Sequence, residues 1–158
     1  MKKILSLLAV AALAGCATQN LTPEQGAIDR VFALDSTYPG NSSSVATLVV
    51  SKETTPLEGC PKDFVGAYKD NIAAWKKFAA IEKQMYALDL PKAQSSIKSF
   101  LGSYSTDPLK AIIALKAQWP QFGKELDKAF SEIRDSYTAY TNIAANNGVA
   151  YPKASSFF

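Results

Sequence analysis

The sequence predicts an all-α protein, a single bundle of four to five helices in which two helices are long and antiparallel. Apolar residues recur every three or four positions over long stretches, as they do along the buried face of an α-helix. Prolines, glycines and capping residues separate these stretches. The chain has 158 residues, of which 47% are hydrophobic and 20% are charged, and this length and composition are typical of one globular domain.

The first expected helix begins at Thr22, which can cap the backbone. Pro23 suits the first helical position, and Gln25 completes a capping box. The inward face of this helix is an apolar stripe formed by Ile28, Val31 and Phe32. Tyr38-Pro39-Gly40-Asn41 is expected to end it.

Residues 37–59 receive no firm assignment. Ser42 to Ser44 are typical of a loop, and the short apolar run from Val45 to Val50 fits a strand as well as a helix. The chain then returns to loop at Thr54-Thr55-Pro56 and Gly59.

The second expected helix spans Pro61 to Leu88, with Pro61 in its first turn and Pro91 closing the segment. Glu82 alone breaks its apolar stripe, which otherwise consists of Phe64, Tyr68, Ile72, Trp75, Ala79 and Met85. A shorter helix is expected from Lys92 to Leu101, with Gly102 as its C-terminal stop.

Asp107-Pro108 opens another expected helix, which Trp119-Pro120 interrupts. The last helix has the clearest pattern, and Asn146-Asn147-Gly148 ends it; its stripe is Phe122, Leu126, Phe130, Ile133, Tyr137, Tyr140 and Ala144. Charged residues cover the other faces, with Lys128 and Glu132 four positions apart as for a helical ion pair. The carboxylates Glu125, Asp127, Glu132 and Asp135 are therefore expected to form a solvated face.

Residues 1–16, MKKILSLLAVAALAGC, have the three parts of an export signal, and their apolar run is too short to span a membrane. Leu13-Ala14-Gly15-Cys16 resembles the lipobox of bacterial lipoproteins. This resemblance implies cleavage after Gly15 and acylation of Cys16 by diacylglyceryl and palmitate-type chains. The expected organisation is a signal peptide (1–15), a lipidated tether (16–21), a helical domain (22–150) and an irregular C-terminal tail (151–158).

The resemblance to bacterial lipoproteins also implies where in the cell the protein is located. Residue 17 is Ala, whereas Asp at that place marks inner-membrane retention in enterobacterial lipoproteins, so the outer membrane facing the periplasm is implied. Membrane lipid, held through the acyl anchor, is the first expected partner. The tether from Ala17 to Leu21 spans at most ~18 Å, so the domain is expected to stay close to the membrane.

The composition argues against several kinds of functional site. Lys2 and Lys3 belong to the expected signal peptide, so the mature chain would keep 15 of the 17 basic residues beside 14 acidic ones. This nearly neutral charge disfavours a nucleic-acid partner. The chain contains no His, and it has neither a thiol cluster nor a calcium-binding loop. No metal, no cofactor and no catalytic residue are expected.

Cys60 is the only thiol besides Cys16. It precedes a helix N-terminus, a location that lowers a thiol pKa and favours reactivity. We expect a packed structural thiol; a disulfide with another chain or a redox partner is the first alternative, and a catalytic thiol is the second.

Aromatic residues at helical spacing usually form a core, but a helical bundle can also hold a ligand among them. Tyr68, Trp75, Tyr137 and Tyr140 are the candidate pocket residues, since a buried phenol needs a hydrogen-bond partner.

The expected function is a non-enzymatic interaction or structural module that binds another envelope protein near the membrane. An assembly factor and an immunity or exclusion protein fit this description equally well. The alternative is a carrier or sensor of a small apolar ligand in the bundle core, and an enzyme that uses Cys60 is the third possibility.

Overall fold

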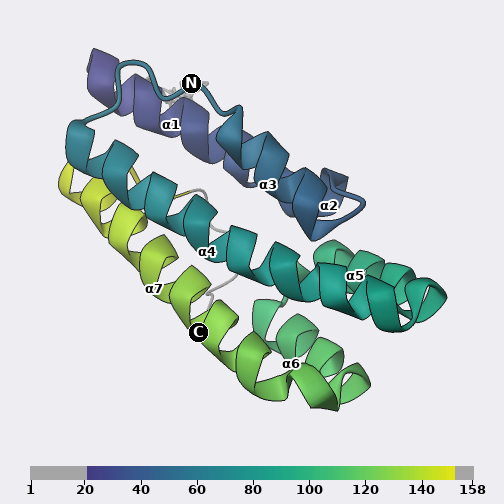
Figure 1. The fold of residues 1–158 in the computed structure, drawn as a ribbon. Coiled ribbons are helices and arrows are strands. Elements are labelled where there is room, and N and C mark those ends of the chain that lie inside the picture. The colour runs from purple at the N-terminus through teal and green to yellow at the C-terminus, as the bar shows by residue number, and fades with distance from the viewer. Residues whose placement is uncertain (1–20, 152–158) are drawn as a thin grey trace, which may run out of the picture.

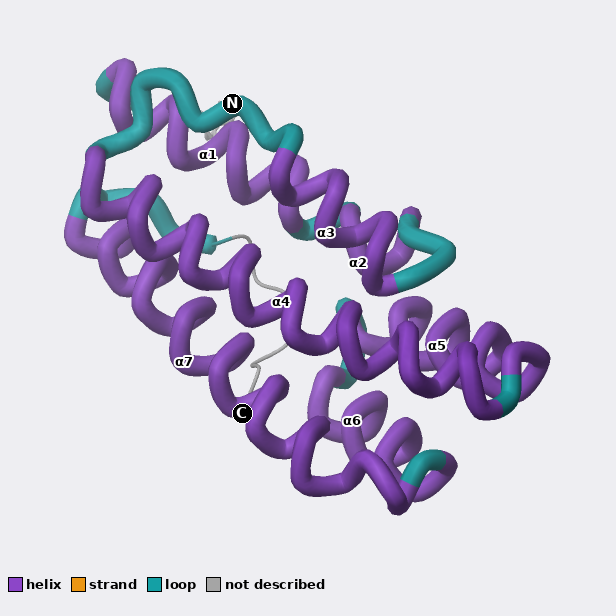
Figure 2. The backbone as a smooth tube through the Cα atoms, viewed as in Figure 1, coloured by secondary structure: helices purple, strands orange, loops and turns teal. Residues whose placement is uncertain are grey.

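The computed structural model describes residues 21–151. All of its regular elements in this range are helical (Figure 2): α1 Pro23–Asp35, α2 Tyr38–Asn41, α3 Val45–Glu53, α4 Lys62–Leu88, α5 Leu90–Tyr104, α6 Pro108–Gln118, the 3-10 turn Pro120–Phe122 and α7 Gly123–Asn146. Within this range, none of the helices combines the length and the apolar character needed to cross a bilayer.

The long helices α4 and α7 lie side by side and antiparallel, and α4 also contacts α3 and α5 (Figure 1). Helix α3 packs along one side of α4, next to α1, and α5 packs against α4 and α6. The all-α bundle with two long antiparallel helices is therefore confirmed.

Side-chain caps explain where most helices begin. Thr22 and Gln25 form the expected capping box at α1, and Ser44 and Thr47 form a second one at α3. Asp89 accepts a hydrogen bond from the Lys92 amide at the start of α5, and Asp107 caps α6 in the same way, each at 3.0 Å.

The structure decides one open assignment and corrects one expectation about local structure. The run from Val45 to Val50 is helical, because the Ser44 capping box starts α3 and its residues Val45, Leu48 and Val49 are buried in the core. Gly102 does not stop α5, which continues to Tyr104 because Tyr104 is buried against Trp75. The tetrapeptide Tyr38–Asn41 follows the end of α1 as a one-turn helix of its own, α2.

The core contains two groups of touching aromatic rings. One surrounds Phe32, Phe64 and Tyr140, whose ring centroids lie 5.9–6.0 Å apart. The other surrounds Phe78, Phe100 and Phe130, at 4.9–5.4 Å. Aromatic rings at these separations add to the free energy of burial, so each group joins helices that are distant in sequence.

The two ends of the described chain are tied together. Gln25 Nε2 donates a hydrogen bond to the Asn147 carbonyl at 2.9 Å, which connects the start of α1 to the end of α7. Gly148 follows with φ +78°, and a Cβ atom there would lie 2.9 Å from Gln25 Nε2. The positive φ therefore favours glycine at this position, and a Cβ atom would in addition displace the Gln25 side chain from its hydrogen bond.

We expect Gly148→Ala to lower the free energy of unfolding by at least about 1 kcal/mol, because alanine disfavours a positive φ and would displace Gln25. Gly102→Ala is the matched control. Gly102 lies in the exposed interior of α5 with open space around it, so this change should stabilise by ~0.5–1 kcal/mol. Urea unfolding monitored by circular dichroism measures both, and equal effects of the two variants would contradict the role of Gly148.

Candidate functional site

A charged pair lies in the middle of the bundle. Asp35 and Lys52 are only 7% and 4% exposed, and Lys52 Nζ forms an ion pair with Asp35 Oδ1. The Tyr68 hydroxyl donates to Asp35 Oδ1 at 3.0 Å, and the Tyr140 hydroxyl donates to Asp35 Oδ2 at 2.9 Å. The carboxylate thus receives donors from three other helices, α3, α4 and α7.

Local structure explains why these groups meet. Asp35 continues the buried stripe of α1, since it lies four positions after Val31, and Lys52 lies four positions after Leu48 on α3. Both residues fall in the last turn of their helices. A cation is favoured at a helix C-terminus, whereas a carboxylate there is not, so Asp35 depends on the donors around it.

The charged pair extends into a wider polar network. Lys52 Nζ lies 4.8 Å from the centroid of the Tyr68 ring, which gives a cation–π contact. Thr55 Oγ1 lies 2.8 Å from the Tyr38 hydroxyl and 3.4 Å from the Tyr68 hydroxyl. The buried polar atoms of this network therefore satisfy one another, as stable burial of polar groups requires.

A cavity adjoins the charged pair. Its volume is about 70 Å³, which is enough to hold at least one water molecule. Residues from α1, α2, α3, α4, α5 and α7 and the segments after them line it: Asp35, Ser36, Tyr38, Pro39, Leu48, Lys52, Asn71, Trp75, Tyr104, Ser105, Ile133, Tyr137, Tyr140 and Tyr151.

The phenols at this site are held neutral. Burial raises the pKa of Tyr68 and of Tyr140, and the nearby Asp35 carboxylate raises both further. Burial and Asp35 likewise raise the pKa of Tyr137 and Tyr151. Neutral phenols keep their hydroxyl protons, which lets them donate hydrogen bonds.

The candidate pocket residues from the sequence come together here. Trp75, Tyr137 and Tyr140 line the cavity, and Tyr68 reaches its wall through the hydrogen bond to Asp35. Sequence analysis missed Asp35, Lys52 and Asn71. The sequence pattern that could have identified these three residues is a polar residue on an otherwise apolar helical stripe. Sequence analysis noted this pattern only at Glu82.

Cys60 does not line the cavity. Cys60 is half-buried in the loop before α4, and burial raises its thiol pKa, the opposite of the direction expected from its place near a helix N-terminus. The predicted lipidation site, Cys16, lies outside the described residues.

Glu82 has a structural role, because its buried carboxylate accepts hydrogen bonds from the amides of Val45 and Ala46 at 2.8 and 3.1 Å and so caps α3. Tyr86 donates to the same carboxylate at 2.9 Å.

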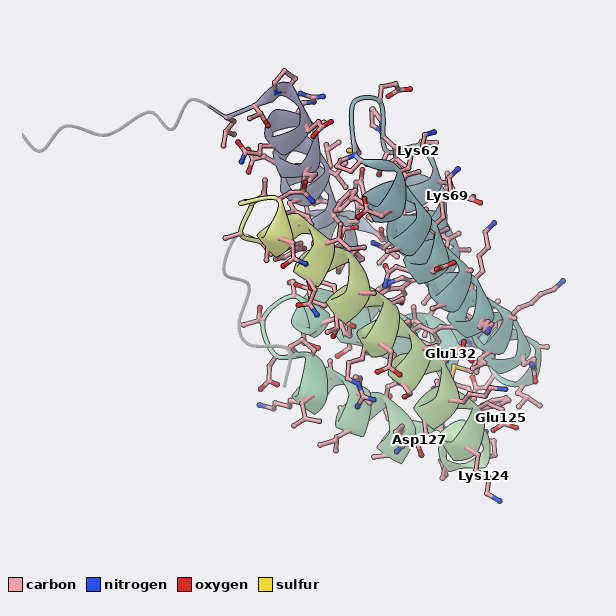
Figure 3. The ribbon with its side chains drawn as sticks, turned by 90° about the vertical axis from the view of Figure 1, so that its left-hand side faces the viewer. Lys62, Lys69, Lys124, Glu125, Asp127 and Glu132 are labelled. Carbon is pink, nitrogen blue, oxygen red and sulfur yellow. The ribbon has the colours of Figure 1, made fainter. Side chains whose placement is uncertain are left out.

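The other carboxylates of interest lie on the surface. Figure 3 shows Lys124, Glu125, Asp127 and Glu132 along the outside of α7. Glu132 pairs with Lys77 of α4 at 2.5 Å, Asp127 pairs with Lys116 of α6, and Asp135 pairs with its neighbour Arg134. Among residues 21–151, no group of three or more potential ligand side chains is placed to hold a metal ion.

The chain matches no protein-family model, no curated protein and no solved structure. The candidate site therefore has to be interpreted from its own geometry.

We expect Asp35→Ala to lower the free energy of unfolding by about 3–5 kcal/mol, because it leaves the Lys52 ammonium buried without a counter-ion. The double variant Asp35→Ala/Lys52→Met should be more stable than Asp35→Ala alone. Asp135→Ala, which removes an exposed carboxylate, is the control and should change stability by no more than ~0.5 kcal/mol. If Asp35→Ala and Asp135→Ala behave alike under chemical denaturation, the buried pair does not hold the helices together.

Stability should fall as the pH rises above about 10. Unfolded phenols lose their protons near pH 10, whereas burial, helped by Glu82, raises the pKa of Tyr86 to about 12, and the phenols at the cavity are also raised. The folded state then binds more protons than the unfolded state, so the free energy of unfolding decreases with pH. Tyrosinate absorbance at 295 nm and loss of helical circular dichroism should therefore develop together. Ionisation of most tyrosines near pH 10 with the helices intact would contradict this.

Proposed function

We propose that this protein is a non-enzymatic lipoprotein, anchored through acylated Cys16 at the periplasmic face of the outer membrane, whose helical domain carries or senses a small, largely apolar molecule. The observation behind the binding function is the cavity beside Asp35 and Lys52. Ligand sites in proteins are concave, mostly apolar and lined by aromatic residues, with a few polar groups that orient the ligand. The cavity wall has this composition.

The charges at the cavity favour binding over catalysis. The Asp35 carboxylate is held by one ammonium and two phenol hydroxyls, and a general base needs a carboxylate that is available to the substrate proton. The phenols are held neutral, which suits hydrogen bonding to a ligand rather than nucleophilic attack.

Interaction with another envelope protein is the second candidate, and exposed apolar side chains favour it. Leu109 and Ile113 lie four positions apart on α6 and are 54% and 59% exposed. Leu88 and Leu90, at the turn between α4 and α5, are 64% and 50% exposed. Exposed apolar side chains mark protein–protein contacts where they form a contiguous patch.

Filling the cavity tests the binding function. Ser105 lines the cavity at the end of α5, so Ser105→Phe should occupy it, whereas Ser99→Phe introduces the same ring at an exposed position of the same helix. Small molecules extracted from the full-length protein, purified from membranes, would be quantified by mass spectrometry. We expect a near-stoichiometric molecule from the wild type and Ser99→Phe, and at least a tenfold smaller amount from Ser105→Phe with its circular dichroism unchanged.

If no molecule depends on the cavity, the carrier or sensor function is wrong. Crosslinking in living cells then tests the second candidate function, interaction with another envelope protein. A reproducible protein adduct that is lost in Leu109→Glu/Ile113→Glu would support it.

A further inference from the structure

The cavity beside Asp35 is too small for an ordinary ligand. Its volume of about 70 Å³ is well below the roughly 300–1,000 Å³ of typical ligand pockets. Protein interiors are close-packed and compress little, so a ligand fits only when a residue of the cavity wall moves out. The proposed binding function therefore requires a wall residue that can leave.

Tyr151 is the wall residue that is held least firmly. The other aromatic side chains of the wall lie in helices: Tyr38, Trp75, Tyr104, Tyr137 and Tyr140. Tyr151 instead lies beyond Asn146, the last residue of α7. It lines the cavity and is only half-buried, so it forms part of the outer wall, next to solvent.

The backbone after α7 is fixed as far as Val149. Val149 is buried, and its amide donates to the Ala144 carbonyl at 2.9 Å, which closes α7 in a Schellman motif. Among residues 21–151, the backbones of Ala150 and Tyr151 make no hydrogen bond, and Ala150 is exposed. A rotation of the backbone at Ala150 would therefore move Tyr151 out of the wall without disturbing α7.

The ring of Tyr151 shows which chemical group this part of the wall accepts. It meets Phe32 of α1 and Tyr137 of α7 edge to face, with centroids 4.6 and 5.4 Å apart. Aromatic rings at these separations attract each other in addition to the effect of burial. Burial and the nearby Asp35 carboxylate raise the pKa of Tyr151, which indicates that the same place disfavours an anion.

We propose that the space filled by Tyr151 is part of the ligand site, and that an uncharged aromatic molecule binds by displacing this ring from Phe32 and Tyr137. Displacement adds the volume of a phenol ring to the adjoining cavity, so the two spaces together hold a molecule larger than either. This inference rests on the proposed binding function and adds the place where the ligand binds, its chemical class and a competitor built into the chain.

The competition sets the size of the expected effect. Burial favours an aromatic side chain over its exposed state by a factor of roughly 10–100, so the state with Tyr151 displaced has a population of roughly 1–10%. The apparent affinity for a ligand is reduced by that fraction. Removing the Tyr151 ring should therefore tighten binding by about 10- to 100-fold.

The probe is p-cresol, which is the side chain of tyrosine as a free molecule. Its dissociation constants would be measured by NMR titration of the full-length protein in detergent micelles, where its partition into micelles is the same for every variant. Tyr151→Ala vacates the site, whereas Tyr151→Phe keeps a ring in it. Tyr86→Ala is the second control, because it removes a half-buried tyrosine of α4 that does not line the cavity.

We expect Tyr151→Ala to bind p-cresol at least tenfold more tightly than the wild type, Tyr151→Phe and Tyr86→Ala do. In the wild type, p-cresol should also shift the Tyr151 ring resonances towards those of an exposed tyrosine and remove their nuclear Overhauser contacts with Phe32. The Val149 amide should stay protected from hydrogen exchange. This second readout distinguishes a displaceable ring from a cavity that the substitution creates.

Two results would overturn the inference. If Tyr151→Ala binds p-cresol no more tightly than the wild type does, the space does not accept a free aromatic ring. If Tyr151 of the wild type keeps its contacts with Phe32 up to the solubility limit of p-cresol, its ring is a permanent part of the core. The binding function is decided separately, by the molecule extracted in the cavity-filling experiment.

Discussion

The arrangement of this bundle depends on burying one carboxylate. An isolated charge in a protein interior is strongly unfavourable, and Asp35 is tolerated because an ammonium and two phenols converge on it from three other helices. These donors fix where α3, α4 and α7 stand relative to the end of α1. Apolar packing alone would allow small rotations and shifts of the helices, whereas hydrogen bonds of about 3 Å do not. The position of the cavity follows, since its wall consists of the same residues and their neighbours.

Much of this fold could be predicted from the sequence, because most helices are determined by residues within the helix itself or next to its ends. The capping box at Thr22 and the periodic stripes of α4 and α7 each determine a helix without reference to the rest of the chain. The failures have a common cause in tertiary contacts. The run at Val45 is too short for its period to decide between strand and helix, and the Glu82 carboxylate that caps α3 comes from 37 positions further along the chain. Gly102 stays within α5 because Tyr104 packs on Trp75, a contact that no local rule contains.

The candidate site was predictable only on its aromatic side. Large aromatic residues at helical spacing identify Trp75, Tyr137 and Tyr140. Their spacing does not predict that the charged pair of Asp35 and Lys52 lies beside them. Asp35 and Lys52 each lie four positions after a buried apolar residue of the same helix, but charged residues are rarely buried, so the stripe alone does not predict their burial. Their burial becomes evident only when four helices are assembled. Asn71 Oδ1 is buried without a hydrogen bond from the described residues, a property that only a three-dimensional structure can reveal.

The hydrogen bond between Gln25 and the Asn147 carbonyl places the two ends of the helical domain next to each other. A short peptide could therefore join them, and new ends could be opened at the turn between α4 and α5, where Leu88, Asp89 and Leu90 are exposed. Such a circular permutant would keep every helix and every buried contact described above. It would also move the N-terminus to the other end of the long helix α4, so the proposed lipid anchor would then hold the domain in the inverted orientation.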